Sequence, residues 1–495
     1  MGSLEGIITG FQTAFSIEAI LFVMLGVFVG TIIGMLPGLG PISAIAVMIP
    51  MTFGMDPSTA LIMMAGVYYG AIFGGSTSSI LLNAPGVSGV VATAFDGYPM
   101  AQQGKAGKAL AISAIASFVG GTVSVILLML FAPLLANVAI SFGPPAYFAL
   151  MVLGLTAIAS LSEGSTIKAL IAAVAGFMVV TIGIDPQTGT QRYTFGNINL
   201  LEGIDFLVIA LGLFAIAEVC SLVLNRKDQS MRNAHNIGSL KLTKQDFKEM
   251  SGPMSRQSFL GFIIGVLPGA GATIASFIAY ISEKRIAKKP EEFGKGSIKG
   301  LTGPETANNA ATSGAFVPLL SLGIPGSGTT AVMLGAFLVL GVQPGPMLMT
   351  ERPEIFWGVI ASMYIGNIFL LILNLPLIPY FAKVLKIPRP LLISLVIIFS
   401  MIGVYAISFN TFDLYMLLLF GLIGFIMRLF AFPAPPFILA FILGGMMEQS
   451  FRQSLTISNG DVMIFLTNPI SLALLILSLL SFVFPLIGQL RKRKG

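Results

Sequence analysis

The sequence predicts an all-α polytopic membrane protein with about 10–12 transmembrane segments, some of them re-entrant or broken. Of its 495 residues, 55% are hydrophobic and 10% are charged, and the mean hydropathy is +0.92. A soluble domain usually carries about 25% charged residues. Apolar runs of about 16–27 residues recur along the chain, and such runs are long enough to cross a hydrocarbon core of about 30 Å. The 56 glycines and 28 prolines indicate closely packed or interrupted helices.

The apolar runs predict the membrane segments in chain order. A first run over 15–34 is followed by LPGLGP and a second run that ends at Pro50, which together predict a hairpin or a broken span. The next predicted segments in the first half cover 61–82, 109–135, 146–161, 169–184 and 206–224. The second half contributes 259–280, 331–342, 355–380, 391–408, 414–430, 437–447 and 470–487.

The chain contains one cysteine and one histidine, Cys220 and His235. An internal disulfide and a cysteine metal cluster both need more than one cysteine. His235 lies in a polar loop, so it cannot build a histidine-rich metal site inside the membrane. These counts disfavour an integral membrane enzyme, and we expect no cofactor.

Basic loops predict which side of the membrane each end of a segment occupies. Lysines and arginines gather in 225–257, 284–299, 383–389 and the RKRK tail, which places these parts and the C-terminus in the cytoplasm. Two of these loops flank 259–280, so this segment must return to its own side. We therefore expect a re-entrant or half-helix hairpin that turns at PGAG, and a single kinked span is the alternative. The charge-poor loop 184–197 is expected outside, where it can receive a partner protein.

The two halves of the chain contain similar motifs in the same order. GTIIGMLPGLG at Gly30–Gly40 aligns without gaps on GFIIGVLPGAG at Gly261–Gly271. Farther along, Gly74, Leu82, Pro85 and Gly86 recur at one constant offset as Gly314, Leu322, Pro325 and Gly326. Lysines at opposite ends of the matching spans predict that the copies are inverted. We expect a first membrane repeat over 1–224, a cytoplasmic linker over 225–257 and a second repeat over 258–495.

A broken, polar stretch from Gly303 to Thr330 indicates a binding site. Lipid offers no hydrogen bonds, so broken backbone at membrane depth must be covered by protein or line a cavity. Transporters bind substrates at such breaks, where helix N-termini attract anions and hydroxyl or amide groups donate hydrogen bonds to carboxylates. The predicted substrate-binding residues are Ser76, Thr77, Ser78, Ser79, Asn83, Pro85, Gly86, Asn308, Asn309, Gly326, Ser327, Gly328, Thr329 and Thr330.

Oxygen-rich groups near the same breaks predict a site for a coupling ion. The candidates are Glu305, Thr306, Asn308, Gly38 and Gly269, and they suit either a proton or a cation such as sodium. Glu305 can carry a proton, bind a cation or cap a helix, and the sequence leaves these roles open. No other metal site is expected. Such a site can hold an anion and a cation without a buried arginine. Snorkelling is expected near span ends for Glu163, Glu202, Asp205, Arg352, Arg428 and Glu448.

The motifs around these residues resemble the large membrane subunit of the tripartite tricarboxylate transporter family. They include YYGAIFGGSTSSILLNAPG, GIDPQTGTQRYTFG, GVLPGAGATIASFIAYISEK and GPETANNAATSGAFVPLLSLGIPGSGTTAVMLGAFLVLGVQPGP. The resemblance implies a secondary transporter of the bacterial cytoplasmic membrane that works with a small membrane subunit and an extracytoplasmic substrate-binding protein. It also implies uptake of di- or tricarboxylates such as citrate, driven by sodium or protons, through an elevator-like movement.

The sequence and this resemblance together favour ion-coupled carboxylate uptake by alternating access. The expected partners are the two other subunits, the carboxylate and membrane lipid, and no nucleic acid is expected. A passive channel for small anions is the main alternative, and an integral membrane enzyme is a weaker one. Accumulation of substrate against its gradient distinguishes a carrier from a channel.

Overall fold

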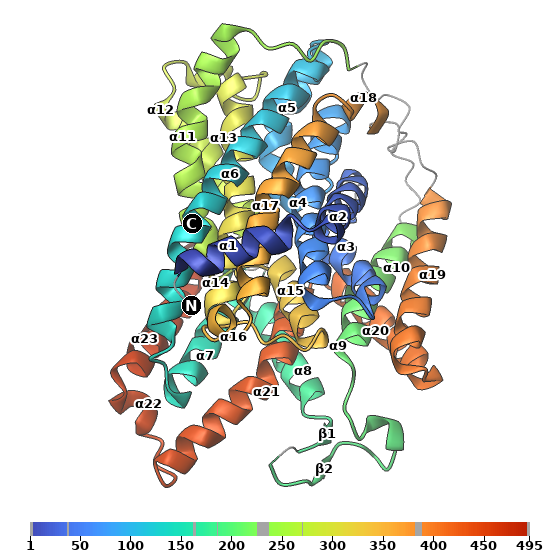
Figure 1. The fold of residues 1–495 in the computed structure, drawn as a ribbon, viewed down its shortest axis with the longest axis vertical. Coiled ribbons are helices and arrows are strands. Elements are labelled where there is room, and N and C mark those ends of the chain that lie inside the picture. The colour runs from blue at the N-terminus through green and yellow to red at the C-terminus, as the bar shows by residue number, and fades with distance from the viewer. Residues whose placement is uncertain are drawn as a thin grey trace.

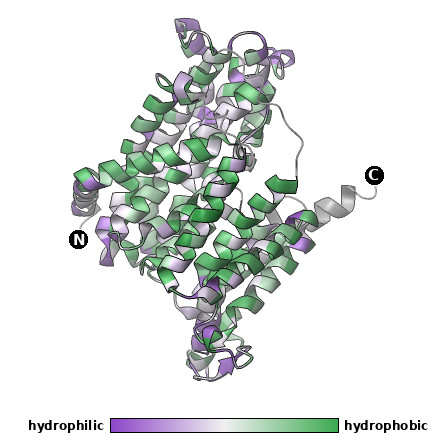
Figure 2. Cartoon of the chain, turned by 90° about the vertical axis from the view of Figure 1, so that its right-hand side faces the viewer, coloured by the Kyte–Doolittle hydropathy of each residue, from purple (hydrophilic) through white to green (hydrophobic). Residues whose placement is uncertain are grey.

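The predicted all-α membrane class is confirmed by a computed structural model, which describes residues 3–36, 39–161, 165–185, 187–224, 237–269, 271–381 and 389–492. In this described part, seven helices are long and apolar enough to cross a membrane. Shorter apolar helices cover Pro41–Thr52, Pro144–Ala159, Thr166–Val180, Gly328–Val339 and Pro469–Val483. Hydrophilic residues gather at the two ends of the long axis, and the helices between them are mostly hydrophobic (Figure 2).

The first half is a series of helices in which the long spans alternate with short pieces. Its helices are α1 (Ser3–Ala14), α2 (Ile17–Met35), α3 (Pro41–Met48), α4 (Pro57–Leu82), α5 (Val91–Gln102), α6 (Ala106–Ala139), α7 (Pro144–Leu161) and α8 (Thr166–Val180). Two 3₁₀ turns, η1 (Ile49–Thr52) and η2 (Ser88–Val90), follow the breaks after α3 and α4. The last span joins α9 (Phe206–Ala210), a π-helical segment (Leu211–Ile216) and α10 (Ala217–Leu224).

The second half begins with the predicted helical hairpin. Helix α11 (Lys244–Val266) is separated from α12 (Gly271–Ile286) at the PGAG motif. The following helices are α13 (Ile298–Gly314), α14 (Phe316–Leu322), α15 (Gly328–Val339), α16 (Leu348–Glu351), α17 (Pro353–Asn374), α18 (Ile378–Phe381), α19 (Arg389–Ser408), α20 (Thr411–Leu429), α21 (Ala434–Ile457), α22 (Ile464–Thr467) and α23 (Pro469–Lys492).

The expectation of a polar loop over the whole of 225–257 is wrong, because α11 begins at Lys244 inside this range. A capping box starts the helix: the Thr243 side chain accepts from the Asp246 amide, and the Asp246 carboxylate accepts from the Thr243 amide. Lys108 on α6 adds a 2.7 Å ion pair to Asp246. Residues 225–236, with His235, lie outside the described residues.

A short β-hairpin, β1 (Gly183–Ile184) with β2 (Gln191–Arg192), projects at the opposite end of the long axis from α11 and α12 (Figure 1). It is tied to α21, where Arg452 lies 2.9 Å from the Asp185 carboxylate and Arg192 lies 2.8 Å from that of Glu448. The backbone amide of Gln187 and the Arg452 guanidinium lower the pKa of Asp185 from its ordinary value of 3.8 to about 2. Glu448 therefore belongs to an ion-pair network rather than to a snorkelling position.

Matching glycines form matching helix contacts in the two halves. A methyl group added to Gly34 of α2 would collide with the Ala71 carbonyl of α4, and one added to Gly265 of α11 would collide with the Ala311 carbonyl of α13. One helical turn earlier, the same contact joins Gly30 to Val67 and Gly261 to Ala307. The aligned motifs therefore make aligned contacts, as expected if α2 and α4 correspond to α11 and α13.

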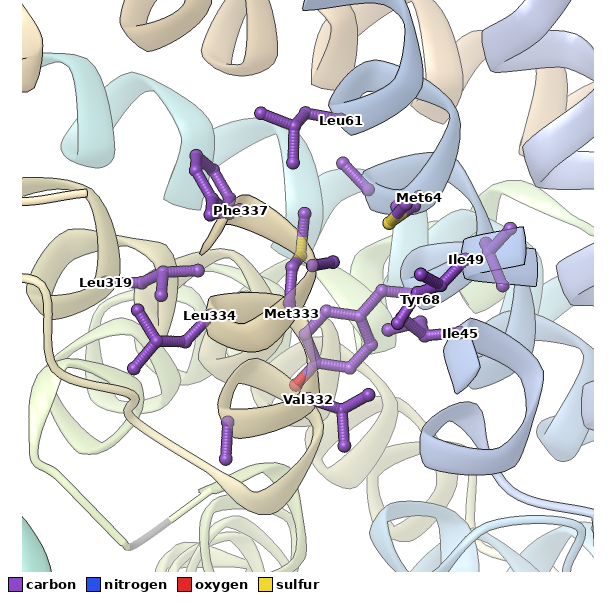
Figure 3. Close-up of a cluster of buried hydrophobic side chains, with 14 of the residues drawn as sticks. Ile45, Ile49, Leu61, Met64, Tyr68, Leu319, Val332, Met333, Leu334 and Phe337 are labelled. Atoms are coloured by element: carbon purple, nitrogen blue, oxygen red, sulfur yellow. The ribbon is translucent and has the colours of Figure 1, made fainter. Parts of the chain in front are cut away.

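The largest hydrophobic core crosses between the two halves. Figure 3 shows Tyr68 of α4 among apolar side chains from α3 and η1 on one side and from α14 and α15 on the other. Members such as Ile45, Val332 and Phe337 are completely buried. This core holds the short helices α3 and α15 in place, and both begin at a chain break.

Candidate functional site

Four chain breaks, two from each half, meet around one cavity of about 580 Å³. The first half contributes Gly40–Ser43, which follow LPGLGP, and Gly86–Gly89, which follow α4. The second half contributes Gly269 and Gly271–Ile274 from its hairpin turn, and Ser327–Thr329 from the break before α15. The walls are completed by Tyr68, Ile72, Ile158, Phe214, Glu218, Arg428 and the segment 431–435. The breaks predicted to form the site are thus brought together.

The breaks of each half are packed against each other in the same way. Gly86 lies against the carbonyl of Gly34, and Gly326 lies against that of Gly265, at the equivalent place in the second half. The Gly269 amide also donates to the Gly326 carbonyl over 2.9 Å. A side chain at Gly86 or Gly326 would separate the paired segments, so these glycines shape the cavity through their backbone.

Three helices begin at residues that line the cavity. Helix α3 starts after Gly40 without a side-chain cap, α12 starts at Gly271, and α15 starts after Ser327. Ser327 and Thr330 form a reciprocal capping box, and the Tyr68 hydroxyl lies 3.4 Å from that of Ser327. A helix N-terminus carries roughly half a positive charge. The three N-termini make the cavity favourable for an anion.

Arg428 of α20 lines the cavity and pairs with the carboxylate of Glu218 on α10. Its side chain is 35% exposed, whereas that of Glu218 is 7% exposed. Arg428 lies in the last turn of α20 and is exposed, as expected of an arginine near the end of a span, but it also borders the cavity. The buried Glu218 carboxylate compensates the charge of its guanidinium. This cation is the main site residue that the sequence did not reveal.

The π-helical segment Leu211–Ile216 brings part of the cavity wall into position. Phe214, which lies in this segment, faces the cavity, and its carbonyl accepts a hydrogen bond of 3.2 Å from the Ser43 hydroxyl of α3. Single π-helical turns often occur at functional sites, where they free a carbonyl from the regular helical pattern. Here the Phe214 carbonyl links this span, which also carries Glu218, to the first turn of α3.

A second polar site lies around Glu305, which is completely buried in the interior of α13. Its carboxylate accepts hydrogen bonds from four hydroxyl groups: Ser76 of α4 at 2.9 Å, Thr93 of α5, and Ser113 and Ser117 of α6 at 2.9 and 2.8 Å. We call these four residues and Glu305 the hydroxyl cage. Glu305 caps no helix, so that alternative from the sequence is wrong.

The cage lies close to the cavity along two segments of chain. On α4, the cavity-lining Ile72 precedes Ser76 by four residues. In the segment after α4, the cavity-lining Gly89 precedes Thr93 by four residues. Four residues of helix correspond to about 6 Å along the axis. The cage and the cavity are therefore neighbours that share helix α4.

Asn308 stands out because neither atom of its buried side-chain amide has a hydrogen-bond partner among the described residues. Such groups are rare in folded proteins, since an unpaired buried amide is costly. Its neighbour Asn309 is satisfied by the Glu305 backbone carbonyl at 3.0 Å, and Thr306 by that of Thr302 at 2.9 Å. Asn308 is thus the unpaired member of the predicted amide pair, and it lies outside the residues that line the cavity.

The other predicted residues have structural contacts or lie outside the cavity wall. Ser78 and Ser79 both donate to the Gly75 carbonyl within α4, at 3.0 and 2.9 Å, and Thr77 is buried in the same helix. Asn83 ends α4 in a left-handed conformation with φ of 52°, and Pro85 is half-buried in the segment that follows. Gly38 lies outside the described residues.

A polytopic bundle with broken helices around an anion-favouring cavity has the architecture of a membrane transport protein. The chain belongs to the tripartite tricarboxylate transporter TctA family, whose match covers residues 20–439. It is 45% identical over its whole length, and over 98% of the relative, to an Agrobacterium vitis protein described as an uncharacterized 52.8 kDa protein in the TAR-I ttuC' 3' region.

A second relative in the same organism, described as an uncharacterized protein in the TAR-II ttuC' 3' region, is 44% identical. That match covers 47% of this chain and 97% of the relative. No solved structure matches the chain. The family membership agrees with the resemblance of the motifs and makes the chain a component of a tripartite transporter system.

Proposed function

We propose that this chain imports a di- or tricarboxylate such as citrate across the bacterial cytoplasmic membrane as an ion-coupled secondary transporter. The observation that carries the proposal is the convergence of Arg428 and three helix N-termini on one cavity formed by the four breaks. Its volume of about 580 Å³ falls within the range of about 300–1,000 Å³ typical of small-molecule sites.

The groups that line the cavity suggest how a carboxylate is held. Arg428 presents a planar guanidinium, which bonds a carboxylate with two parallel hydrogen bonds. The amides at the starts of α3 and α15 and the hydroxyl of Thr329 donate further hydrogen bonds.

Charge balance in the cavity supports coupling to a cation. A di- or tricarboxylate brings two or three negative charges, whereas the one arginine in the cavity wall is already balanced by Glu218. Moving uncompensated charge through a bilayer is expensive. Protons or sodium ions that travel with the substrate reduce this charge, and the inward gradient of the ion then drives accumulation.

The proposed cycle uses the two halves of the chain as inverted repeats. The matching contacts of α2 with α4 and of α11 with α13 support a duplicated core that moves as a unit, in an elevator-like manner, between two sides. A small membrane subunit is proposed to accompany this chain. An extracytoplasmic binding protein is proposed to deliver substrate on the side of the β-hairpin, opposite the cytoplasmic C-terminus.

Uptake into proteoliposomes tests this function. We expect labelled citrate, or another dicarboxylate, to accumulate inside vesicles that hold this chain and its small subunit, with the binding protein outside and an inward proton or sodium gradient. Accumulation should collapse when the coupling gradient is removed. Uptake that only equilibrates, and that depends on neither ion nor the binding protein, would instead identify a passive channel.

A further inference from the structure

The hydroxyl cage contains a buried acid without a compensating cation. Glu305 is completely buried, and among the described residues no lysine, arginine or histidine forms an ion pair with its carboxylate. An isolated carboxylate in an apolar interior is strongly disfavoured as an ion. We propose that Glu305 is the site at which the coupling proton is bound and released, an inference that rests on the proposed transport function.

The contacts in the cage suit a proton better than a sodium ion. The oxygen–oxygen distances of 2.8 and 2.9 Å from Ser76, Ser113 and Ser117 are those of direct hydrogen bonds between hydroxyls and the carboxylate. A hard metal ion would need several oxygens to direct their lone pairs at one empty point. Here the hydroxyl hydrogens are directed at Glu305 instead, and a proton requires no additional space.

The cage also has a place for the extra proton. Ser76 lies 2.9 Å from both carboxylate oxygens and 3.4 Å from the Ile72 carbonyl, so its hydroxyl has a second acceptor. When Glu305 is protonated, its O–H donates to the Ser76 oxygen, and the Ser76 hydrogen turns to the Ile72 carbonyl. When Glu305 is ionised, Ser76 donates to the carboxylate. The two states differ by one proton and one hydroxyl rotation.

Other buried acids on the helices packed against α13 form ion pairs or accept backbone hydrogen bonds, whereas the buried Tyr69 hydroxyl has no hydrogen-bond partner within the described ranges. Asp96 of α5 accepts from the amides of Gly294, Gly296 and Ser297, at 2.7–2.9 Å. Glu283 of α12 pairs with Arg256 of α11 at 2.7 Å. Lys108 of α6 pairs with Asp246. On α4, Tyr68 contacts Ser327 and Tyr69 is packed beside Phe316. Among the described acids on these helices, Glu305 is therefore the buried one that lacks a charged or backbone partner.

The position of the cage explains how proton binding can be coupled to movement. Glu305 belongs to the second half of the chain, whereas all four hydroxyls belong to the first half. A neutral Glu305 fits the closed cage at little electrostatic cost, whereas an ionised one depends on the hydroxyls of the first half for its hydrogen bonds, so a change in its protonation changes the energy that holds the two halves together. Ile72 and Ser76 share a face of α4, so substrate in the cavity and the proton in the cage act on the same helix.

The test compares the wild type with Glu305→Gln, in proteoliposomes that contain a pH-sensitive dye. We expect the wild type to acidify the lumen as labelled citrate enters. Glu305→Gln, which stays neutral, should retain citrate exchange in counterflow without a gradient but lose accumulation driven by a pH gradient at least tenfold. The matched control is Glu448→Gln. This substitution removes an acid from the ion pairs between α21 and the β-hairpin, outside the cage, and should leave proton-driven accumulation unchanged.

Each outcome decides the matter. Exchange without lumenal acidification in the wild type, or full proton-driven accumulation by Glu305→Gln, would overturn the proton site while leaving transport intact. Absence of wild-type exchange would overturn the proposed function together with this inference. If Glu305→Gln fails to fold, Ser113→Ala removes one donor to the carboxylate. It should then shift the pH midpoint of uptake to more alkaline pH by roughly one unit, and an unchanged midpoint would contradict the proposal.

Discussion

The role of Arg428 becomes clear only from its position in the structure and from its ion pair with Glu218. In the sequence it stands near the end of an apolar run, where an arginine usually extends toward the membrane surface. In the structure it lines the cavity and pairs with Glu218, which is more than 200 residues away in the sequence. Since nothing in the linear sequence links α10 to α20, only the tertiary packing reveals this cation.

We expect Arg428→Gln to weaken citrate binding by about 10- to 100-fold. A hydrogen bond to a charged group contributes about 1.5–3 kcal/mol, and each 1.4 kcal/mol corresponds to a factor of ten. Combining it with Glu218→Gln avoids leaving an unpaired acid in the wall. The measurement is the Kd for citrate of the purified protein. The matched control is Arg452→Gln in the β-hairpin network, and equal affinity of both variants would contradict the assigned anchor.

Glu305 and Asn308 show which parts of the site the sequence did predict. Both lie in the motif that was singled out for its polar residues inside an apolar chain, and both are fully buried. Their different situations could not be predicted. The four hydroxyls around Glu305 come from three other helices, and the lack of partners for Asn308 depends on what those helices place beside it.

At the scale of the helix, the sequence predicted the breaks well and the helix starts less well. Proline and glycine in LPGLGP and PGAG mark the ends of α2 and α11 directly. The start of α11 lies inside the predicted loop 225–257, because a high density of basic residues is compatible with both a loop and a helix. The capping box of Thr243 and Asp246 was present in the sequence and marks this start. The positions of the basic residues predict on which side of the membrane a segment lies, but they do not predict whether that segment is helical.

The crossing of α11 with α13 depends on Gly265, and we expect Gly265→Leu to destabilise the protein by about 1–3 kcal/mol, the usual effect of overpacking. The added side chain would collide with the Ala311 backbone and, through Gly326, displace the cavity wall. Thermal unfolding followed by light scattering in detergent measures the loss. Gly445→Leu is the control, because nothing lies within 4 Å of a methyl group there. A similar midpoint for both variants would contradict the close crossing.

For the whole molecule, the predicted orientation can be tested with cysteines. We expect a cysteine at Gly189, in the β-hairpin loop, to react with a membrane-impermeant maleimide added to intact cells, and a cysteine at Ser239 to remain unlabelled. Both positions are exposed, and the native thiol is first removed by Cys220→Ala. Labelling after cell lysis serves as the control for Ser239. The opposite pattern would reverse the orientation of the chain.

The hydroxyl cage also has a consequence for biosynthesis. The ribosome delivers Ser76, Thr93, Ser113 and Ser117 to the membrane long before Glu305 has been made. Until then, these hydroxyls lack the carboxylate that completes the cage, and lipid supplies no replacement for it. The first half of the chain therefore contains the four polar hydroxyls of the cage before the second half supplies their common acceptor. A nascent chain truncated before α13 should for this reason remain open to water and to membrane proteases.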